Sequence, residues 1–96
     1  MKTFNDLRGE LAQKNPELFI AMEIVGKIMA ARDRQGISQR KLSEMSGVPQ
    51  KTISRIENGI DVPKISTLIK LTTALGLEFS VVEKETADEQ SATLNY

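Results

Sequence analysis

The stretch that decides the fold is residues 36–59, which read GISQRKLSEMSGVPQKTISRIENG. Ser38 is a candidate N-cap for a first short helix, because its hydroxyl can accept a hydrogen bond from a backbone amide of the first turn. Gly47 tolerates the left-handed backbone of a tight turn. A second short helix over residues 49–58 then ends at Gly59. This spacing predicts a helix-turn-helix, in which two short helices cross steeply through a tight turn.

Small and apolar residues occupy the positions at which the two helices of this motif must meet. The first helix has to approach the second closely, which requires a small side chain at Ser43. Pro49 is tolerated at the start of the second helix, because it falls in a first turn. Apolar side chains then lock the pair together and onto its neighbours. The residues predicted to hold the motif together are Leu42, Ser43, Gly47, Val48, Ile53 and Ile56.

The second helix of the motif has a polar and basic outer face, opposite Ile53 and Ile56. A recognition helix places its N-terminal residues against base edges, where Gln pairs with adenine and Arg or Lys with guanine. Backbone amides and polar side chains at helix starts bind phosphates. For each single residue, a merely solvated side chain remains the alternative. We predict base contacts from Gln50, Lys51, Ser54 and Arg55, and phosphate contacts from Gln39, Thr52, Asn58 and Lys64.

Apolar residues near the start of the chain recur at helical spacing. Phe4, Leu7 and Leu11 predict a short amphipathic helix over residues 3–12, with Thr3 or Asn5 as its N-cap. Such a helix is marginal by itself and needs a surface to pack on.

Two longer helices flank the motif. Residues 17–35 repeat apolar positions every three or four residues, which predicts a long amphipathic helix with Met22 and Met29 in its core face. Residues 66–75 predict a further helix after the motif, ended by Gly76.

The C-terminal part of the chain has a different pattern. In residues 77–84, apolar and polar residues alternate at first and β-branched residues follow, which predicts one β-strand. Since a single strand needs a partner, we expect that partner in another molecule, unless the segment is a short helix or coil on the core. Residues 85–96 are polar and mostly acidic, and we expect them to be disordered. The predicted organisation is an amphipathic extension over 1–16, a helix-turn-helix domain over 17–76, the strand over 77–84 and the tail over 85–96.

The net charge of the chain is zero, with 13 Lys and Arg against 13 Asp and Glu, and on its face this argues against a nucleic-acid partner. The distribution changes that inference. Residues 1–25 have a net charge of −1, residues 26–70 of +5 and residues 71–96 of −4. A basic centre between acidic ends indicates a polyanion-binding module, although an ordinary solvated surface can give the same pattern.

The central stretch resembles the Cro/C1-type (XRE-like) helix-turn-helix family. The resemblance rests on GISQxxLSxxSGV from residue 36 and ISRIENG from residue 53, and it covers about residues 25–76. It implies a mainly α fold, a lambda-repressor-like bundle of about five helices, here with one C-terminal β-strand. It also implies a phosphate contact from Gln39 and base contacts from Gln50, Lys51 and Arg55. The family often joins Arg32 and Glu57 by a salt bridge, so the resemblance implies a structural role for Glu57. Because one motif contacts half an operator, we expect a homodimer on palindromic double-stranded DNA with half-sites ~34 Å apart.

The layout of the whole chain also resembles the HigA-type antitoxins of type II toxin–antitoxin modules. FNDLRGEL from residue 4, FIAMEIV from residue 19 and a short strand ending near Val81 and Val82 suggest this subgroup. The resemblance implies a partner that is a RelE-like mRNA-cleaving toxin, and repression of the chain's own operon. Phe4, Leu7 and Leu11 are then the toxin-facing candidates, and an acidic terminus suits a basic partner. The alternative is that this helix packs only on its own domain.

Two other functions compete with a DNA-binding antitoxin. One is a free-standing Cro/C1-type transcriptional repressor without a toxin partner. A small enzyme is a distant third, because a chain without His and Cys lacks the usual zinc ligands, a Cys nucleophile and a Ser-His-Asp triad. We expect no catalytic residues, no cofactor and no metal. No apolar run approaches ~18 residues, so we expect no membrane span, and the missing cysteine fits a cytoplasmic protein.

Overall fold

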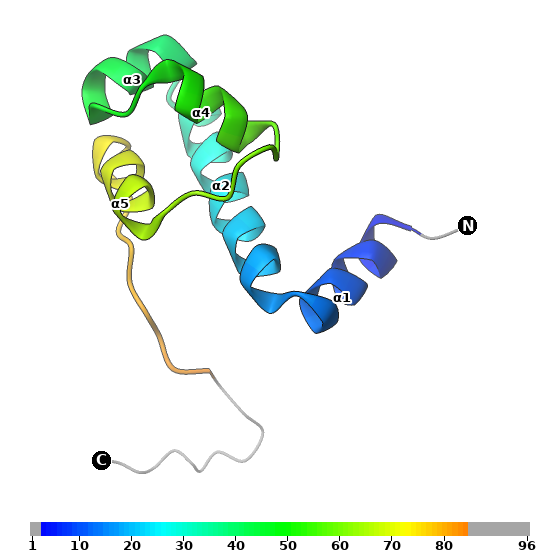
Figure 1. Cartoon of the computed structure of the whole chain (residues 1–96). Coiled ribbons are helices and arrows are strands. Elements are labelled where there is room, and N and C mark those ends of the chain that lie inside the picture. Colours follow the sequence, from blue (N-terminus) through cyan, green and yellow to red (C-terminus); the bar gives the residue numbers. More distant parts are fainter. Residues whose placement is uncertain (1–2, 85–96) are drawn as a thin grey trace.

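The computed structural model describes residues 3–84, apart from the side chains of Phe4 and Asn5, and this part of the chain folds into five helices (Figure 1). The predicted acidic tail over 85–96 lies outside the described residues. The mainly α fold and the helix-turn-helix agree with the sequence analysis. The helices are α1 (Phe4–Lys14), α2 (Pro16–Arg34), α3 (Gln39–Ser46), α4 (Gln50–Glu57) and α5 (Ile65–Ala74).

Helices α2 to α5 enclose the hydrophobic core. In Figure 1, α3 and α4 lie at one end of the long α2, and α5 lies beside them. Helix α3 contacts both α4 and α5, and α4 also contacts α2. A cluster of buried apolar side chains fills this core. Full burial of one Leu or Ile side chain contributes about 1.5–3 kcal/mol, so the cluster fixes how the four helices pack against one another. Its buried members are Ile28, Ala31, Leu42, Val48, Ile53, Leu68, Leu71 and Leu75.

Two side-chain hydrogen bonds to backbone carbonyls accompany this core. The side-chain amide of Gln35, which follows α2, donates to the carbonyl of Leu75 at 2.8 Å and so ties the end of α2 to the end of α5. Thr72 is buried on α5, and its hydroxyl donates to the Leu68 carbonyl one turn earlier at 2.9 Å. The buried hydroxyl is therefore satisfied within its own helix.

Helix α1 packs on α2 and projects from the end of α2 that is remote from the motif (Figure 1). Thr3 is its N-cap, and a reciprocal capping box joins Thr3 to Asp6. Asn15 ends α1 and also caps α2 by accepting a hydrogen bond from the Leu18 amide, while Pro16 begins α2. The break between the two helices is therefore one residue long, shorter than the sequence predicts.

The β-strand predicted over residues 77–84 is a wrong prediction for the isolated chain. The structure shows an extended segment that forms no ladder with any residue between 3 and 84. Val81 and Val82 are 95% and 84% exposed. A strand needs a neighbour for its backbone groups, and the described part of the chain offers none. Leu77 packs against the core, but every later side chain in this segment is exposed, so the alternative of a packed coil also fails there.

Two further absences hold for the described residues. None of the five helices there is long and apolar enough to cross a membrane. Between residues 3 and 84, no three His, Cys, Asp or Glu side chains gather into a group that could hold a metal ion.

Candidate nucleic-acid interface

The turn between α3 and α4 is built around Gly47. Its φ of 79° is left-handed, and its amide donates to the Ser43 carbonyl at 2.9 Å, which ends α3. Ser43 is half-buried, as a small residue at a helix crossing should be. The side chain of Val48 is then buried between the helices, and its amide donates to the Ser46 hydroxyl at 3.1 Å. These contacts fix the angle at which α4 is presented.

Helix α4 separates a buried face from a polar face. Ile53 and Ile56 lie in the core at 1% and 4% exposure. The residues predicted to contact bases lie away from them and share the outer side of the helix. Gln50 and Lys51 are exposed, and Ser54 and Arg55 are half-buried at its edge. Pro49 occupies the N-cap position of α4 and makes no side-chain hydrogen bond to the first amides of the helix.

The residues predicted to bind phosphates do not form one cluster. Lys64 and Asn58 are exposed at the start of α5 and the end of α4, and Asn58 donates to the Ser54 hydroxyl at 3.4 Å. Thr52 and Lys64 both line a shallow depression between α4 and α5. Gln39 is different, because its side-chain amide donates to Oε1 of Glu57 at 2.9 Å. One of its two N–H groups therefore serves the fold, and the other takes no part in this hydrogen bond.

Gln39 belongs to a network behind the motif that contains the Arg32–Glu57 pair implied by the resemblance. Nε and Nη2 of Arg32 each donate to a different oxygen of Glu57, both at 2.9 Å, and Nη1 donates to the Ile37 carbonyl at 2.9 Å. The side chains of Arg32 and Glu57 are 17% and 6% exposed. The network joins α2, the loop before α3, α3 and α4, so it holds the end of α4 against α2 and α3.

A second ion pair, which the sequence pattern did not predict, lies on the outer side of the motif. Nε of Arg55 donates to Asp61 at 2.7 Å, and Nη2 donates to the other carboxylate oxygen at 3.1 Å. The hydrogen bonds from Arg55 lower the pKa of the Asp61 carboxyl below its usual range, and the same bonds raise the pKa of Arg55. The signal available in the sequence was an opposite charge six residues after Arg55, across the turn at Gly59 that ends α4.

The family model for helix-turn-helix proteins matches residues 28–82, which is more than half of the chain. The match covers the turn, both helices of the motif and α5. The chain is a Cro/C1-type helix-turn-helix protein. Members of this family bind DNA, and the polar face of α4 is the part of the fold that such a protein presents to it.

Curated relatives of this helix-turn-helix protein include regulators and antitoxins. An uncharacterized HTH-type transcriptional regulator of Haemophilus influenzae is 38% identical over 66% of the chain and 64% of the relative. The HTH-type transcriptional regulator PuuR of Escherichia coli is 39% identical over 72% of the chain, and the match spans only 38% of PuuR. The chain thus spans less than two thirds of the length of these relatives. Antitoxin HipB of Escherichia coli is 24% identical over 79% of the chain and 81% of HipB.

A solved structure described as a toxin–antitoxin module from Streptococcus pneumoniae contains a chain similar to this helix-turn-helix protein along most of its length. The two are 36% identical with a TM-score of 0.67, and the likeness covers 88% of this chain and 96% of the other. A match to 88% of the chain necessarily reaches beyond the residues of the helix-turn-helix family model.

Helix α1 of this helix-turn-helix protein uses only part of its predicted apolar stripe for internal packing. Leu7 is 52% exposed, while Leu11 is half-buried and lines a groove between α1 and α2 together with Phe19. The side chain of Phe4, the third predicted toxin-facing residue, lies outside the description. Arg8 fastens the two helices, because it donates to Glu23 at 2.6 Å and lies 5.3 Å from the centre of the Phe19 ring.

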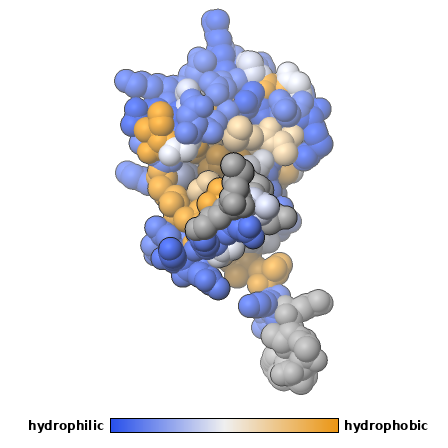
Figure 2. All heavy atoms as spheres, turned by 90° about the vertical axis from the view of Figure 1, so that its right-hand side faces the viewer, coloured by the Kyte–Doolittle hydropathy of each residue, from blue (hydrophilic) through white to orange (hydrophobic). Residues whose placement is uncertain are grey.

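Two methionines that the spacing assigned to the core lie on the surface instead. Met22 and Met29 are 52% and 37% exposed, so the prediction that they fill the core is wrong. They line a shallow groove of about 290 Å³ between α2 and the loop after α4, where Val62 and Pro63 form the other wall. Figure 2 views the molecule from the side of α1 and shows apolar surface on this side. This surface is a candidate for contact with a partner.

Proposed function

We propose that this chain is a sequence-specific DNA-binding antitoxin that neutralises a RelE-like mRNA-cleaving toxin and represses its own operon. The observation that carries the proposal is the likeness to a chain of the Streptococcus pneumoniae toxin–antitoxin module over 88% of this chain. That likeness extends past the helix-turn-helix. The named antitoxin HipB among the relatives points in the same direction.

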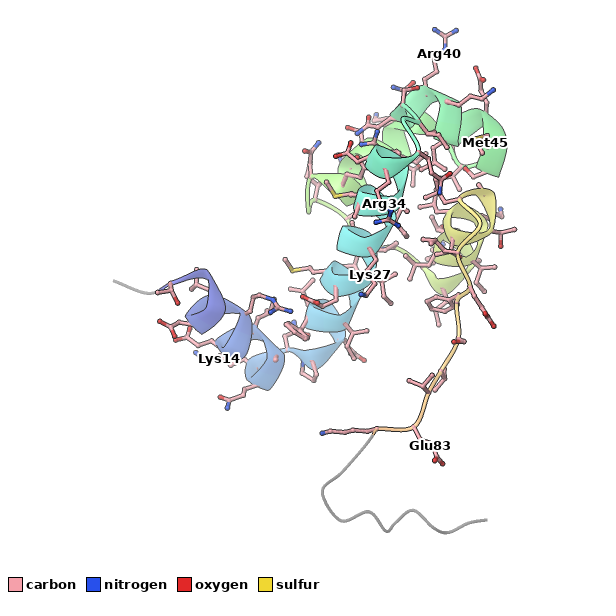
Figure 3. The ribbon with its side chains drawn as sticks, turned by 180° about the vertical axis from the view of Figure 1, so that it is seen from behind. Lys14, Lys27, Arg34, Arg40, Met45 and Glu83 are labelled. Atoms are coloured by element: carbon pink, nitrogen blue, oxygen red, sulfur yellow. The ribbon has the colours of Figure 1, made fainter. Side chains whose placement is uncertain are left out.

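The DNA-binding half of the proposal is supported by the placement of charge. Nine basic and four acidic residues lie in 26–70, the part that contains the motif, against a net negative charge on either side. Figure 3 shows that Arg40, at the start of α3, projects away from the body of the molecule. The proposed base contacts are Gln50, Lys51, Ser54 and Arg55, and the proposed phosphate contacts are Gln39, Thr52, Asn58 and Lys64. Since one α4 reads one half-site, the proposed form on DNA is a homodimer on a palindrome.

The toxin-binding half is supported by apolar surface that the described part of the chain leaves uncovered. Leu7 on α1 and Met22 on α2 are exposed on neighbouring helices, and the groove beside Val62 is open. Helix α1 is remote from α4 (Figure 1), so a toxin held on α1 would leave the recognition helix accessible, whereas the groove beside Val62 is also lined by Ile56 in the last turn of α4. We assign no catalytic activity to the chain itself.

A free-standing repressor is the second candidate. The observation in its favour is that two relatives at 38% and 39% identity are described as transcriptional regulators without mention of a toxin. In that case α1 and the apolar groove serve the chain's own assembly. Both candidates share DNA binding, so only an experiment with a toxin separates them.

Co-expression with the neighbouring reading frame tests the antitoxin proposal. The gene beside this one is cloned alone and together with the chain, and growth and co-purification are measured. We expect growth arrest from the neighbour alone, rescue by the full chain, and a complex that survives size-exclusion chromatography. A neighbour that is harmless when expressed alone and does not bind the chain would leave the free-standing repressor as the better conclusion.

A matched pair of variants places the toxin surface. Leu7→Asp adds a charge on exposed α1, and Met45→Asp adds the same charge at an exposed site on α3, far from α1. We expect the first to lose rescue and the second to retain it, because a buried unpaired carboxylate is costly at an apolar interface. Equal rescue by both variants would move the toxin surface away from α1.

A further inference from the structure

Arg55 is held from one side by the loop that follows its own helix. The Asp61 carboxylate takes the Nε–H and one Nη2–H of the guanidinium, at 2.7 and 3.1 Å. A guanidinium has five donors in a rigid fork, so both Nη1 hydrogens and one Nη2 hydrogen remain. One hydrogen on each of Nη1 and Nη2 lies along the outer edge of the group, and the second Nη1 hydrogen points back toward Cδ. That outer edge is the one that can donate two parallel hydrogen bonds to O6 and N7 of guanine.

The loop that carries Asp61 is itself attached to Arg55. The amides of Ile60 and Asp61 both donate to the Arg55 carbonyl, at 2.9 and 3.3 Å. The backbone after Gly59 therefore folds back over the last turn of α4. Arg55 is fastened to this loop through its main chain and through its side chain, which limits the rotamers that its long side chain can adopt.

Neither folding stability nor general attraction to DNA accounts for this carboxylate. The side chains of Arg55 and Asp61 are 43% and 45% exposed, and exposed ion pairs contribute little to stability. A negative charge on the face that meets DNA also opposes binding to phosphates. Asp61 shares the shallow depression beside α5 with Lys64 and Thr52, two of the proposed phosphate contacts. The carboxylate thus lowers the attraction of this surface for DNA phosphates.

We propose that Asp61 is a positioning residue for base selectivity: it aims the outer edge of Arg55 at one guanine and prevents Arg55 from binding phosphates nonspecifically. This inference rests on the proposed role of α4 in reading bases. An arginine side chain without a carboxylate partner would bind any phosphate within reach, and it would lose rotamer freedom on binding a base. An arginine already fixed by a carboxylate loses less when it meets guanine, and it gains less from a random sequence.

The test compares the full chain with Asp61→Asn, which keeps the shape of the side chain and removes its charge. Duplexes are selected from a randomised 25-base-pair library with the wild-type chain, and affinities for the selected site, for the same site with each base changed and for random duplex are measured. Glu44→Gln is the matched control. It also removes one acidic charge from an exposed pair of the motif, Arg40–Glu44 at 3.8 Å, but that pair does not involve α4.

We expect Asp61→Asn to bind random duplex roughly two- to fivefold more tightly, because one repulsive charge is gone. We expect its preference for one guanine in the site to fall about tenfold, the order of one bidentate base contact. Glu44→Gln should tighten binding to both kinds of DNA alike and leave the preference unchanged. In an Arg55→Ala background, Asp61→Asn should no longer alter base preference, because the residue acts through Arg55.

An unchanged or sharper guanine preference in Asp61→Asn would overturn the inference, since Asp61 would then either have no influence on Arg55 or mask it. Circular dichroism melting of each variant shows whether it is folded. If Asp61→Asn unfolds, Arg55→Lys, which keeps the charge but lacks the fork, is measured in its place and should lose the same guanine preference. Failure of the proposed function has a different signature: the wild-type chain would then enrich no sequence from the library.

Discussion

Replacing Glu57 with Ala tests whether the network behind the recognition helix stabilises the fold. The replacement leaves the guanidinium of Arg32 with a single protein acceptor, the Ile37 carbonyl, and leaves Gln39 without the acceptor that it uses. Removing one partner of a buried pair costs about 3–5 kcal/mol. Arg32 is 17% exposed, so water can reach part of it and the lower end of that range applies. Adding the lost hydrogen bond of Gln39, we expect a loss of about 3–4 kcal/mol in the free energy of unfolding.

Urea unfolding followed by circular dichroism at 222 nm measures this loss. The chain contains no Trp, so helix content is a better probe than intrinsic fluorescence. For a domain of this size, such a change lowers the melting temperature by roughly 12–30 °C. Asp61→Ala is the matched control, because it breaks a pair of similar length that is half-exposed. We expect its loss of stability to be small compared with that of Glu57→Ala, because an exposed ion pair contributes little.

Two results would refute this reasoning. Equal destabilisation by Glu57→Ala and Asp61→Ala would mean that burial does not govern the contribution of either pair. A double replacement, Arg32→Met with Glu57→Leu, provides the second check. It removes both charges and fills similar volume, so it should recover most of the stability lost in the single variant. If it is as unstable as Glu57→Ala, the loss arises from packing and not from an unpaired charge.

Further predictions concern the residues proposed to contact DNA, the turn at Gly47 and the carboxyl group of Asp61. Lys64→Ala should weaken binding to all DNA sequences alike and lower the slope of log affinity against log salt by about one. Arg55→Ala should cost ~1–3 kcal/mol of binding free energy at the preferred site alone. Equal losses for Arg55→Ala on preferred and random DNA would exclude a base contact by Arg55. Gly47→Ala should lower the free energy of unfolding by about 1–2 kcal/mol, because φ is left-handed and a Cβ there meets no neighbour, so backbone strain is the whole cost. The pKa of Asp61 is lowered in the folded chain, so its pair with Arg55 contributes a little stability at neutral pH, and this is lost as pH falls through the folded pKa. Carboxyl NMR should give Asp61 a lower titration midpoint in the wild-type chain than in Arg55→Ala. A higher midpoint in the wild-type chain would contradict the contact between Arg55 and Asp61.

The elements governed by local chemistry could be predicted from the sequence. The N-cap at Ser38 and the left-handed turn at Gly47 depend on residues only a few positions away, and both lie where the sequence places them. The polar side of α4 follows from the positions of Ile53 and Ile56, since a helix with those residues buried must expose the opposite face. For such features the sequence and the structure carry the same information.

The Arg55–Asp61 pair could not be predicted in this way. Asp61 follows Arg55 by six positions and lies in the loop after α4, so helical spacing does not bring the two together. What joins them is the path of the backbone after Gly59, where two amides fold back onto the Arg55 carbonyl. The β-strand at 77–84 failed for a related reason. Alternation and β-branching describe a side-chain pattern, whereas a strand also requires a neighbouring backbone, and residues 3–84 contain none in position.

The exposed methionines of α2 show why hydrophobic periodicity cannot distinguish an exposed apolar surface from the core. With about 100° between successive residues, the buried arc of α2 runs from Val25 through Ile28 to Ala31, while Met22 and Met29 lie roughly 40–60° beyond Val25 on the other side. The apolar arc of the helix is therefore wider than the arc that the other helices of the core bury. Periodicity counts the whole arc as core, because it registers hydrophobicity and not what packs against it. The excess width on α2, beside the exposed Val62, is where apolar surface remains open to a second protein.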